Sequence, residues 1–388
     1  MIRVIISGGG TGGHVFPAIA IANALKEKVD DIEFLFIGAI GRMEMEKVPA
    51  AGYRIEGLTI SGFQRRLTLK NLSFPFKLLR SLLKARKIIS VFKPDVVVGV
   101  GGYASGPTLR IATEKRIPTL IQEQNSFPGV TNRLLGKKVD KICVAYPGLD
   151  KFFPKEKLVL TGNPIRQDLV NLEGKEKEGR DYFGIHEAGK IVLVIGGSLG
   201  AGTINKAIKS WIEMGSAMHE VQLLWQTGKY YHEEIKAQLF NSDNQPLTAN
   251  CKVFPFIDRM DLAYAVSDLI VSRAGAIAIS ELCMVGKPVI LIPSPNVAED
   301  HQTRNAEALV GRKAALMVKD SDAEGTLGNK ISMLLSDPVS QHELQQNIRK
   351  MAIPDAAGKI AEEVLKLIPL KKIEDIRNSN VKKGGPVD

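Results

Sequence analysis

The stretch Ile2–Leu25, IRVIISGGGTGGHVFPAIAIANAL, sets the plan on which the chain is built. Residues 3–7 form a short run rich in β-branched side chains, which predicts a buried strand. Five glycines follow between residues 8 and 13, and apolar residues then recur at helical spacing, with Pro17 expected in the first helical turn. A glycine turn that opens a helix presents backbone N–H groups and the positive end of the helix dipole, so we expect an anionic or oxygen-rich ligand here. His14 stands at the helix entry and can exchange a proton near neutral pH.

Other interpretations of this turn are less well supported. Gly8-x-Gly10-x-x-Gly13 matches the dinucleotide fingerprint, which also requires an acidic residue at the end of the second strand. The strand expected over 33–37 runs into Gly38-Ala-Ile-Gly41 with no carboxylate at its tip, which disfavours NAD. No Gly-Lys-Ser/Thr follows the turn, which disfavours a Walker loop. Taken alone, the turn leaves His14 open as a catalytic group or as a helix-start side chain bonded to backbone.

Length and composition predict a globular protein of two domains. The chain has 388 residues, of which 44% are hydrophobic, and its mean hydropathy is −0.01. No apolar run reaches the roughly 18–20 residues that span a bilayer, and the N-terminus enters a strand directly, so we expect no signal peptide. Three cysteines, Cys143, Cys251 and Cys283, lack ligand-like spacing and are expected to be reduced core residues of a cytosolic protein.

Positive charge is concentrated in the first half. Residues 1–165 hold 25 Lys and Arg against 13 Asp and Glu, a net +12, whereas the remainder holds 27 against 29. This asymmetry predicts an anionic partner, such as nucleic acid, a membrane surface or a phosphorylated substrate. Large apolar residues alternate with basic ones over 63–87, a pattern suited to interfacial membrane contact or to an ordinary amphipathic helix with a solvated basic face. Nucleic acid is disfavoured, because no aromatic platform or nucleic-acid motif is found.

Further candidate elements of the first half follow expected strands. The strand over 95–100 ends in a second glycine turn, Gly101–Pro107. The strand over 117–121 ends in Gln122-Glu-Gln-Asn125, polar groups whose burial is costly unless they bind something, so we favour a ligand there. Gly162-Asn-Pro164 is typical of an interdomain hinge.

The second half repeats the opening plan. A strand over 191–195, a glycine turn over 196–202 and a helix over 204–214 are expected. The segment 268–281 predicts a strand, a small-residue turn and a helix carrying Glu281, which could accept two hydrogen bonds from a ribose diol or complement the helix dipole. Asp320-Ser-Asp322 is interpreted as a helix cap rather than a metal site.

Seven blocks in order resemble the MurG family of GT-B glycosyltransferases. They are Gly9–His14 with Phe16-Pro17, Gly101-Gly-Tyr103, Glu123-Gln-Asn125, Gly162-Asn-Pro164 with Arg166, Gly196-Gly-Ser198, Arg273-x-Gly-Ala276 with Glu281, and His301-Gln302-x-x-Asn305. The resemblance extends to about residue 368 and departs from the family pattern at Gln122, Leu199 and Ala278, where the family more often has His, Gln and Thr.

The resemblance implies an α/β GT-B fold, with two Rossmann-like doubly wound domains facing a cleft. It implies an acceptor- and membrane-binding domain over 1–165 and a UDP-GlcNAc-binding domain over 166–353. A helix over 354–370 is expected to pack back on the N-terminal domain, and residues 371–388 to form a disordered tail.

The implied reaction is an inverting transfer of GlcNAc from UDP-GlcNAc to the C4 hydroxyl of the MurNAc of lipid I, giving lipid II. No metal or other cofactor is expected. The partners implied are UDP-GlcNAc, lipid I, the anionic membrane surface and, as candidates, cell-wall and division proteins, but no nucleic acid. The expected location is peripheral, at the cytoplasmic face of the inner membrane.

The resemblance also assigns site residues, with His14 as the catalytic base. Uracil is expected at Ile257, ribose at Glu281, phosphates at Ser198, Arg166 and the Gly275-Ala276 turn, and sugar hydroxyls at Gln302 and Asn125. The full UDP-GlcNAc set is Thr11, Gly12, Gly13, Asn125, Arg166, Ser198, Ile257, Gly275, Ala276, Glu281 and Gln302. The acceptor set is Gly10, Gly101, Gly102, Tyr103 and Glu123.

The alternatives are another GT-B enzyme, such as a diacylglycerol glycosyltransferase or a UDP-GlcNAc epimerase, and a non-catalytic membrane-bound scaffold. The Glu123-Gln-Asn125 block and Gln302 favour the first reading over other GT-B enzymes. The intact His14, Arg166 and Glu281 argue against a scaffold that has lost its activity.

Overall fold

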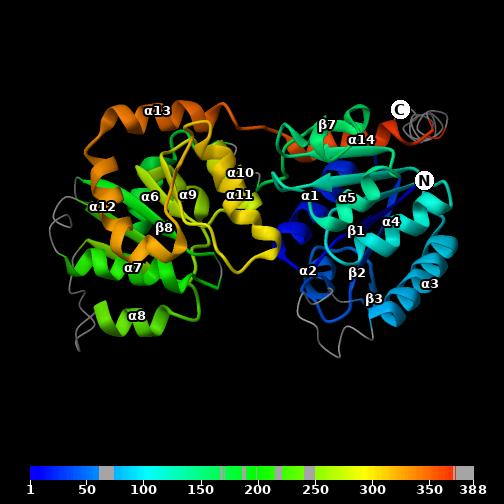
Figure 1. Cartoon of the computed structure of the whole chain (residues 1–388), viewed down its shortest axis with the longest axis horizontal. Coiled ribbons are helices and arrows are strands. Elements are labelled where there is room, and N and C mark those ends of the chain that lie inside the picture. The colour runs from blue at the N-terminus through cyan, green and yellow to red at the C-terminus, as the bar shows by residue number, and fades with distance from the viewer. Residues whose placement is uncertain are drawn as a thin grey trace, which may run out of the picture. The chain divides into compact units, whose positions relative to one another are not determined.

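The computed structural model describes residues 1–60, 74–166, 169, 171–185, 189–197, 199–214, 221–239, 250–369 and 372. The chain divides into two compact units, one of Met1–Ile165 with Asp355–Asp388 and the other of Arg166–Pro354. Each unit is built on its own parallel sheet with helices packed against it (Figure 1). The prediction of two doubly wound α/β domains is confirmed.

The sheet of the first unit has the strand order β3-β2-β1-β4-β5-β6-β7, and every pairing is parallel. Its strands are β1 (Ile2–Ser7), β2 (Ile32–Ala39), β3 (Ile55–Leu58), β4 (Val96–Gly99), β5 (Thr119–Glu123), β6 (Lys141–Val144) and β7 (Leu158–Leu160). Its helices are α1 (Gly12–Lys28), α2 (Glu44–Ala50), α3 (Phe74–Phe92), α4 (Ser105–Glu114), α5 (Val130–Gly136) and α14 (Ala356–Lys366), with 3₁₀ turns η2 (Leu149–Lys151) and η3 (Lys155–Lys157).

The centre of this sheet lies between β1 and β4. Both strands are runs of mainly β-branched residues buried on both faces, as a parallel sheet covered on two sides requires. β1 pairs with β2 from Ile2↔Ile32 onward and with β4 from Val4↔Val96 onward, so the strand order reverses between β1 and β4. Ligands of doubly wound sheets bind outside the carboxyl ends of the strands at such a reversal, which is where the first two glycine turns lie.

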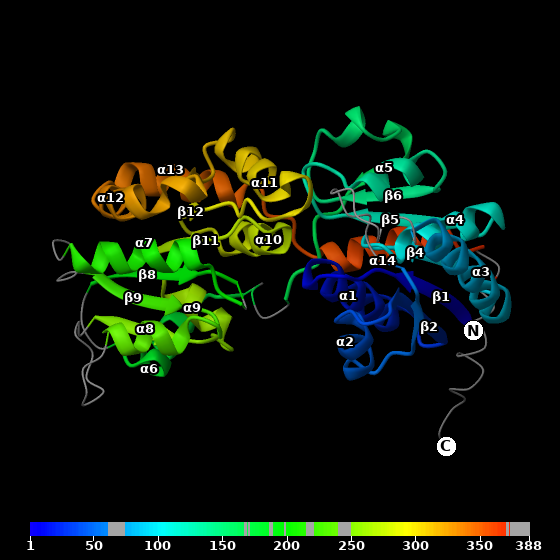
Figure 2. The same cartoon turned by 60° about the horizontal axis from the view of Figure 1, so that its bottom comes forward.

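Helix α14 brings the end of the chain back to the first unit. It packs against α1, and its apolar face shares the core of the unit with β1 and β4 (Figure 2). The buried residues of that face are Ala357, Ile360, Ala361 and Val364. Lys28 of α1 pairs with Glu362 at 3.0 Å on the outer side of this contact.

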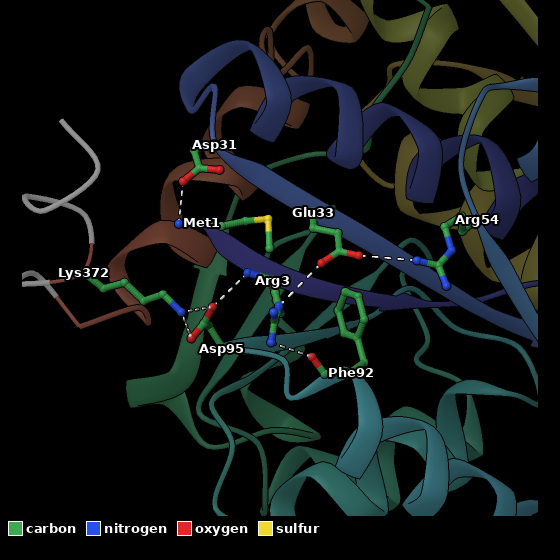
Figure 3. A network of polar contacts seen from close by, with 8 residues as sticks. All are labelled: Met1, Arg3, Asp31, Glu33, Arg54, Phe92, Asp95 and Lys372. Carbon is green, nitrogen blue, oxygen red and sulfur yellow. Dashed lines mark hydrogen bonds and ion pairs between the residues drawn. The ribbon is translucent and has the colours of Figure 1, made fainter. Parts of the chain in front are cut away.

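A polar network lies at the amino ends of β1 and β4, opposite the carboxyl ends that carry the glycine turns (Figure 3). The backbone N–H of Arg3 donates to Asp95 Oδ2 at 2.8 Å, and Lys372 Nζ reaches both Asp95 oxygens at 2.6 and 2.7 Å. The terminal ammonium of Met1 pairs with Asp31, and the Arg3 guanidinium pairs with Glu33. These contacts lie at the amino ends of the strands, so we interpret the network as structural.

The sheet of the second unit has the order β10-β9-β8-β11-β12-β13, again with every pairing parallel. Its strands are β8 (Lys190–Ile195), β9 (Val221–Gln226), β10 (Cys251–Phe254), β11 (Leu269–Ser272), β12 (Val289–Leu291) and β13 (Leu316–Met317). Its helices are α6 (Lys175–Phe183), α7 (Gly202–Glu213), α8 (His232–Leu239), α9 (Met260–Val266), α10 (Ala276–Val285), α11 (His301–Val310), α12 (Ala323–Leu335) and α13 (Pro338–Arg349), with 3₁₀ turns η5 (Ala298–Asp300) and η6 (Asp320–Asp322).

Several sequence expectations need correction in detail. Helix α1 begins at Gly12, so Pro17 lies beyond its first turn, and Phe16, one of the apolar residues at helical spacing, is 55% exposed. The two-residue strand β13 was not predicted, because a run this short carries no periodicity. The tail over 371–388, apart from residue 372, lies outside the described residues.

The three cysteines are free and buried, as expected for core residues. Burial raises the pKa of each thiol to about 12, so none of them is a reactive thiolate near neutral pH. Among the helices of the described residues, none combines the length and apolarity that crossing a membrane requires.

Candidate functional site

His14 is held by the turn from which its own helix starts. Its Nδ1 lies 3.1 Å from the carbonyl oxygen of Gly9 and 3.3 Å from Thr11 Oγ1. A carbonyl oxygen can only accept a hydrogen bond, so Nδ1 carries a proton in this arrangement. In the neutral imidazole the lone pair is then on Nε2, which is the nitrogen able to act as a base.

The second glycine turn, after β4, packs directly against the first. Gly101 and Gly102 have φ of 94° and 83°, and a Cβ at Gly102 would overlap the carbonyl oxygen of Gly9. A Cβ at Gly101 would lie 2.7 Å from His14 Cδ2. Only glycine allows both this backbone conformation and this close approach. The structure therefore brings His14 together with the predicted acceptor residues Gly101 and Gly102, with the half-exposed Tyr103 next in the chain.

The remaining predicted residues of the first turn line its outer side. Thr11 is the N-cap position of α1, and Gly12 and Gly13 are its first two residues. A Cβ at Gly13 would make only an ordinary contact, 3.7 Å from Thr11 Oγ1, and one at Gly10 would meet nothing within 4 Å. Packing within the described residues does not require glycine at 13, which leaves the approach of a bound group as a reason for it.

The polar groups at the end of β5 are satisfied mainly by one another. Gln122 Nε2 donates to Asn163 Oδ1 at 2.8 Å, and Asn163 Nδ2 donates to the carbonyl of Gln124 at 3.0 Å. Gln124 Nε2 donates to Gln122 Oε1 and to the carbonyl of Val100. The inference that these side chains need a ligand is wrong for Gln122, because internal hydrogen bonds use both ends of its amide, whereas Gln124 Oε1 is buried without a hydrogen-bond partner among the described residues. They instead connect β5 to the Gly162-Asn-Pro164 segment.

Glu123 lies beneath the loop that follows β5. Its carboxylate accepts from the Asn125 backbone N–H at 3.0 Å, Asn125 Nδ2 at 3.2 Å, the Gly129 N–H at 3.2 Å and Asn132 Nδ2 at 2.8 Å. Burial raises the pKa of Glu123, although these donors favour its ionised form. This geometry holds Asn125 in place, and direct contact of Glu123 with an acceptor stays a prediction.

Glu44 is a residue of the first unit that sequence reasoning missed. Its side chain, from α2, is buried beneath the first glycine turn, where it accepts from the Gly10 N–H at 2.8 Å and the Ala39 N–H at 2.9 Å. A carboxylate does therefore reach the ends of β1 and β2. Both of its oxygens are bonded to backbone beneath the turn, so it is not presented outward to hold the ribose of NAD.

In the second unit, Arg166 and Glu281 lie against each other. Arg166 Nε is 3.3 Å from Glu281 Oε1, and the Tyr264 hydroxyl donates to Glu281 Oε2 at 3.4 Å. Burial, and then the Glu281 carboxylate, raise the pKa of Tyr264 well above its ordinary value, so the phenol stays protonated and donates. Tyr264 is a further residue that sequence reasoning missed. The structure joins the predicted phosphate and ribose residues in one polar cluster.

The turn that opens α10 is held from behind by α11. Gln302 Oε1 accepts from the backbone N–H groups of Ala274 at 3.3 Å and Ser294 at 2.8 Å, and Asn305 Nδ2 donates to the Ala274 carbonyl at 3.4 Å. Because both acceptor positions of Gln302 Oε1 are taken, its Nε2 group is the part that can donate to a ligand. A Cβ at Gly275 would meet nothing within 4 Å, so there is open space beside this N-cap residue of α10.

The glycine turn after β8 is supported by another missed residue, Gln226. Its Nε2 donates to the Gly197 carbonyl at 3.1 Å, and its Oε1 accepts from the Ile257 N–H at 2.9 Å. One buried amide thus connects the predicted phosphate turn to the predicted uracil segment. Ser198 lies outside the described residues, and its assignment to phosphate stays a prediction.

Asp320 is not a simple cap. It pairs with Arg273 and accepts from Thr203 Oγ1 at 3.0 Å, while Arg273 also donates to the carbonyl of Ile292 at 3.0 Å. Asp322 occupies the N-cap position of α12 without a side-chain capping hydrogen bond. The cap interpretation was therefore wrong in its chemistry, since Asp320 connects α7, through Thr203, to Arg273 in the segment that follows β11. Within the described ranges, no group of three His, Cys, Asp or Glu residues is arranged to hold a metal.

Comparison with known proteins identifies the family and the fold. The glycosyltransferase family 28 N-terminal and C-terminal domain models match residues 4–144 and 191–360. A relative from Phocaeicola vulgatus is 54% identical over 94% of this chain and 96% of its own, and one from Flavobacterium psychrophilum is 51% identical over 95% and 99%. The crystal structure of Acinetobacter baumannii MurG superimposes with a TM-score of 0.78 at 28% identity, covering 94% of this chain and 100% of that one. The GT-B fold is confirmed, and the chain belongs to the MurG family, the UDP-N-acetylglucosamine–N-acetylmuramyl-(pentapeptide) pyrophosphoryl-undecaprenol N-acetylglucosamine transferases of glycosyltransferase family 28.

Proposed function

We propose that this glycosyltransferase moves GlcNAc from UDP-GlcNAc to the C4 hydroxyl of the MurNAc of lipid I and so forms lipid II. Near-full-length relatives carry that activity in their names. The observation that carries the chemistry is the Gly9 carbonyl at His14 Nδ1, which leaves Nε2 as the basic nitrogen at the carboxyl edge of the first sheet.

In the proposed step, Nε2 of His14 takes the proton of the acceptor hydroxyl as its oxygen forms a bond to the anomeric carbon of GlcNAc. The bond from that carbon to the β-phosphate oxygen breaks, UDP leaves with the electron pair, and the anomeric configuration inverts. The N-terminus of α10 and the guanidinium of Arg166 stabilise the charge of the departing diphosphate. We expect this to require no metal.

Donor binding is proposed to exchange partners in the Arg166–Glu281 cluster. The Arg166 side chain is 44% exposed, and such a pair contributes about 1 kcal/mol or less in water. A diphosphate carries more charge than one carboxylate and can take the guanidinium over. Glu281, still held by Tyr264, is then able to accept from the ribose hydroxyls.

Helix α3 supports a peripheral location at the cytoplasmic face of the inner membrane. Phe76, Leu79 and Leu83 share one helical face and are 77%, 57% and 62% exposed. The exposed cations Arg80 and Lys87 flank this face, as expected where apolar groups enter the headgroup region beside anionic lipid. The upstream part of the predicted contact, residues 63–73, lies outside the described residues.

Vesicle binding tests this location. We expect Leu83→Asp to weaken cosedimentation with vesicles containing anionic lipid, whereas Met333→Asp, a substitution of a residue 59% exposed in the second unit, serves as the matched control. Equal loss in both variants would contradict a specific role for α3.

Transfer of labelled GlcNAc from UDP-GlcNAc to a lipid I analogue, with and without EDTA, tests the reaction. Product in both conditions supports the proposed transferase without a metal. No product, with UDP-GlcNAc still bound, would overturn lipid I as the acceptor. Product that disappears with EDTA and returns with a divalent cation would overturn the metal-free mechanism.

A further inference from the structure

The buried carboxylate of Glu44 and the base candidate His14 meet the same peptide group. The peptide between Gly9 and Gly10 donates its N–H to Glu44 Oε2 at 2.8 Å, and its carbonyl oxygen lies 3.1 Å from His14 Nδ1. A trans peptide is planar, with its N–H and C=O pointing in opposite directions. Fixing the N–H therefore fixes the direction of the carbonyl that holds the imidazole.

The surrounding sequence makes room for this carboxylate. A Cβ at Gly9 would overlap the Glu44 carboxylate, and one at Gly38 in β2 would lie 2.5 Å from Glu44 Cγ. The second Glu44 oxygen accepts from the Ala39 N–H at 2.9 Å, so the carboxylate is anchored to β2 as well as to the turn. Glycine inside a strand is unfavourable unless something must approach closely, and here that group is Glu44.

Burial makes the contact directional. Glu44 is 1% exposed, and a carboxylate removed from water must have hydrogen-bond donors. Its donors are two backbone N–H groups, that of Ala39 at the end of β2 and that of Gly10 in the turn after β1. Hydrogen bonds in series also polarise one another, so a carboxylate on the N–H side strengthens the carbonyl as an acceptor on the other side.

We propose that Glu44 is a positioning residue that acts through the Gly9–Gly10 peptide to keep His14 in the tautomer with Nε2 unprotonated. This rests on the proposed function only where it gives that nitrogen the role of base. Glu44 itself touches neither substrate nor the reacting atoms. Its contribution is to present the correct nitrogen in a fixed orientation.

The tautomer of His14 can be read without substrate, by ¹⁵N NMR of the histidine side chains of the full chain, with His14→Ala used to assign the signal. In the unsubstituted protein we expect Nδ1 to be protonated in the neutral ring. In Glu44→Gln the side-chain NH₂ meets one of the two backbone N–H groups, and we expect the population to shift toward the Nε2-protonated form. Glu46→Gln is the matched control, since Glu46 is on the same helix with its side chain 77% exposed.

The transfer assay supplies the second readout. Glu44→Gln is expected to lower kcat by about 10–100-fold, the usual effect of losing a supporting hydrogen bond behind a catalytic group. The KM for UDP-GlcNAc is expected to stay within about twofold, because Glu44 bonds to the N–H of Gly10 and not to Thr11, Gly12 or Gly13, the residues of this turn predicted to meet the donor. If Glu44→Gln fails to fold, Glu44→Asp keeps the charge but shortens its reach, and the same tautomer shift is expected.

An unchanged His14 tautomer in folded Glu44 variants would overturn the proposal. A failure of the proposed function has a different signature, namely that the unsubstituted protein itself makes no product. The tautomer comparison between Glu44→Gln and Glu46→Gln decides the role of Glu44 in that case too.

Discussion

The glycine turns after β1 and after β8 have the same place in their domains, between a strand and a helix, but a different buried side chain supports each of them. Each follows a central strand of a parallel sheet and opens a helix, α1 in the first unit and α7 in the second. The first turn rests on Glu44, which accepts two backbone N–H groups. The second rests on Gln226, which donates to one backbone group and accepts from another. The first turn also holds a histidine by its carbonyl, whereas Leu199 of the second is 59% exposed.

The difference in support matches a difference in chemistry. A carboxylate beneath a turn that receives a diphosphate would repel the ligand, whereas a neutral amide holds the turn without adding charge. Beneath a turn that carries a base the same carboxylate is favourable, because its negative charge stabilises the imidazolium that forms when the base takes up a proton. The pair of supports therefore predicts that the first turn governs proton transfer and the second governs donor affinity.

The largest expected effect separates the two turns at His14. His14→Ala is expected to lower kcat by about 10²–10⁴-fold, the range for removing a general base, while the Kd for UDP-GlcNAc holds. Transfer kinetics and calorimetric titration with UDP-GlcNAc measure the two quantities. His342→Ala, at an exposed histidine of α13, is the control. Near-normal turnover of His14→Ala would show that His14 is not the base. The proposed division between a turn for proton transfer and a turn for donor binding would then no longer hold.

The next effect tests the second support. Gln226→Leu leaves the Gly197 carbonyl and the Ile257 N–H without their buried partner, at a cost of about 1–3 kcal/mol, so we expect the KM for UDP-GlcNAc to rise about tenfold with kcat nearly unchanged. Gln226→Glu adds a charge beneath the turn and is expected to raise this KM further. Steady-state kinetics on both variants beside Glu44→Gln measure the contrast. If the Glu44 and Gln226 variants changed kcat and KM in the same proportions, the proposed difference in function between the two turns would be contradicted.

The features that could be predicted from the sequence are those formed by residues close together along the chain. The stretch 2–25 carries its strand, its turn and its helix within one window, so its periodicity and glycines indicated the structure and the place of His14. The recurrence of the same strand, turn and helix in both halves indicated two α/β domains, whereas the order of the strands in each sheet was not predicted. The buried contact of Gln122 was misjudged, because its partner Asn163 is about 40 residues away in the sequence.

The two supports were missed for the same physical reason. Glu44 bonds to Gly10 across 34 residues, and its local sequence, with Glu46 and Lys47 beside it, is typical of a solvated helix. Gln226 ends a buried strand and bonds to Ile257 across 31 residues. A signal was available in Gly38, which lies inside β2 and not beyond it as expected, because a glycine within a strand indicates close approach by another group.

A smaller effect isolates what Gln302 contributes to the donor. Gln302→Glu keeps an oxygen that accepts from Ala274 and Ser294, but it loses the NH₂ donor and adds a negative charge behind the turn predicted to hold phosphate. We expect the turn to hold with an unchanged melting temperature and the KM for UDP-GlcNAc to rise at least about fivefold, the effect of one ordinary hydrogen bond. Gln302→Ala, measured beside it, should lower both affinity and melting temperature. An affinity equal to that of the unsubstituted protein in Gln302→Glu would show that the amide only supports the turn.

The smallest expected effect on catalysis, and a clear one on stability, lies away from both turns at Asp261 of the second unit. Asp261 is buried and accepts from Arg259 at 2.9 Å through each oxygen and from Lys175 at 3.0 Å. Its hydrogen bonds from Arg259, followed by those from Lys175, hold the pKa of its carboxyl well below the usual range.

A carboxyl group whose folded pKa is depressed stabilises the fold above its unfolded pKa of about 4, and that stabilisation is lost as the pH falls toward the folded value. We therefore expect Asp261→Asn to lower the free energy of unfolding at pH 7 by about 2 kcal/mol and to bring the variant and the unsubstituted protein closer together below pH of about 4. Glu123 of the first unit has the opposite sign, because burial raises its pKa and penalises its ionised form at neutral pH. Urea unfolding at pH 7 and pH 3, followed by tryptophan fluorescence, reports on the second unit alone, since Trp211 and Trp225 both lie there. A stability difference between the two proteins that does not change with pH would mean that Asp261 acts through packing and not through its charge.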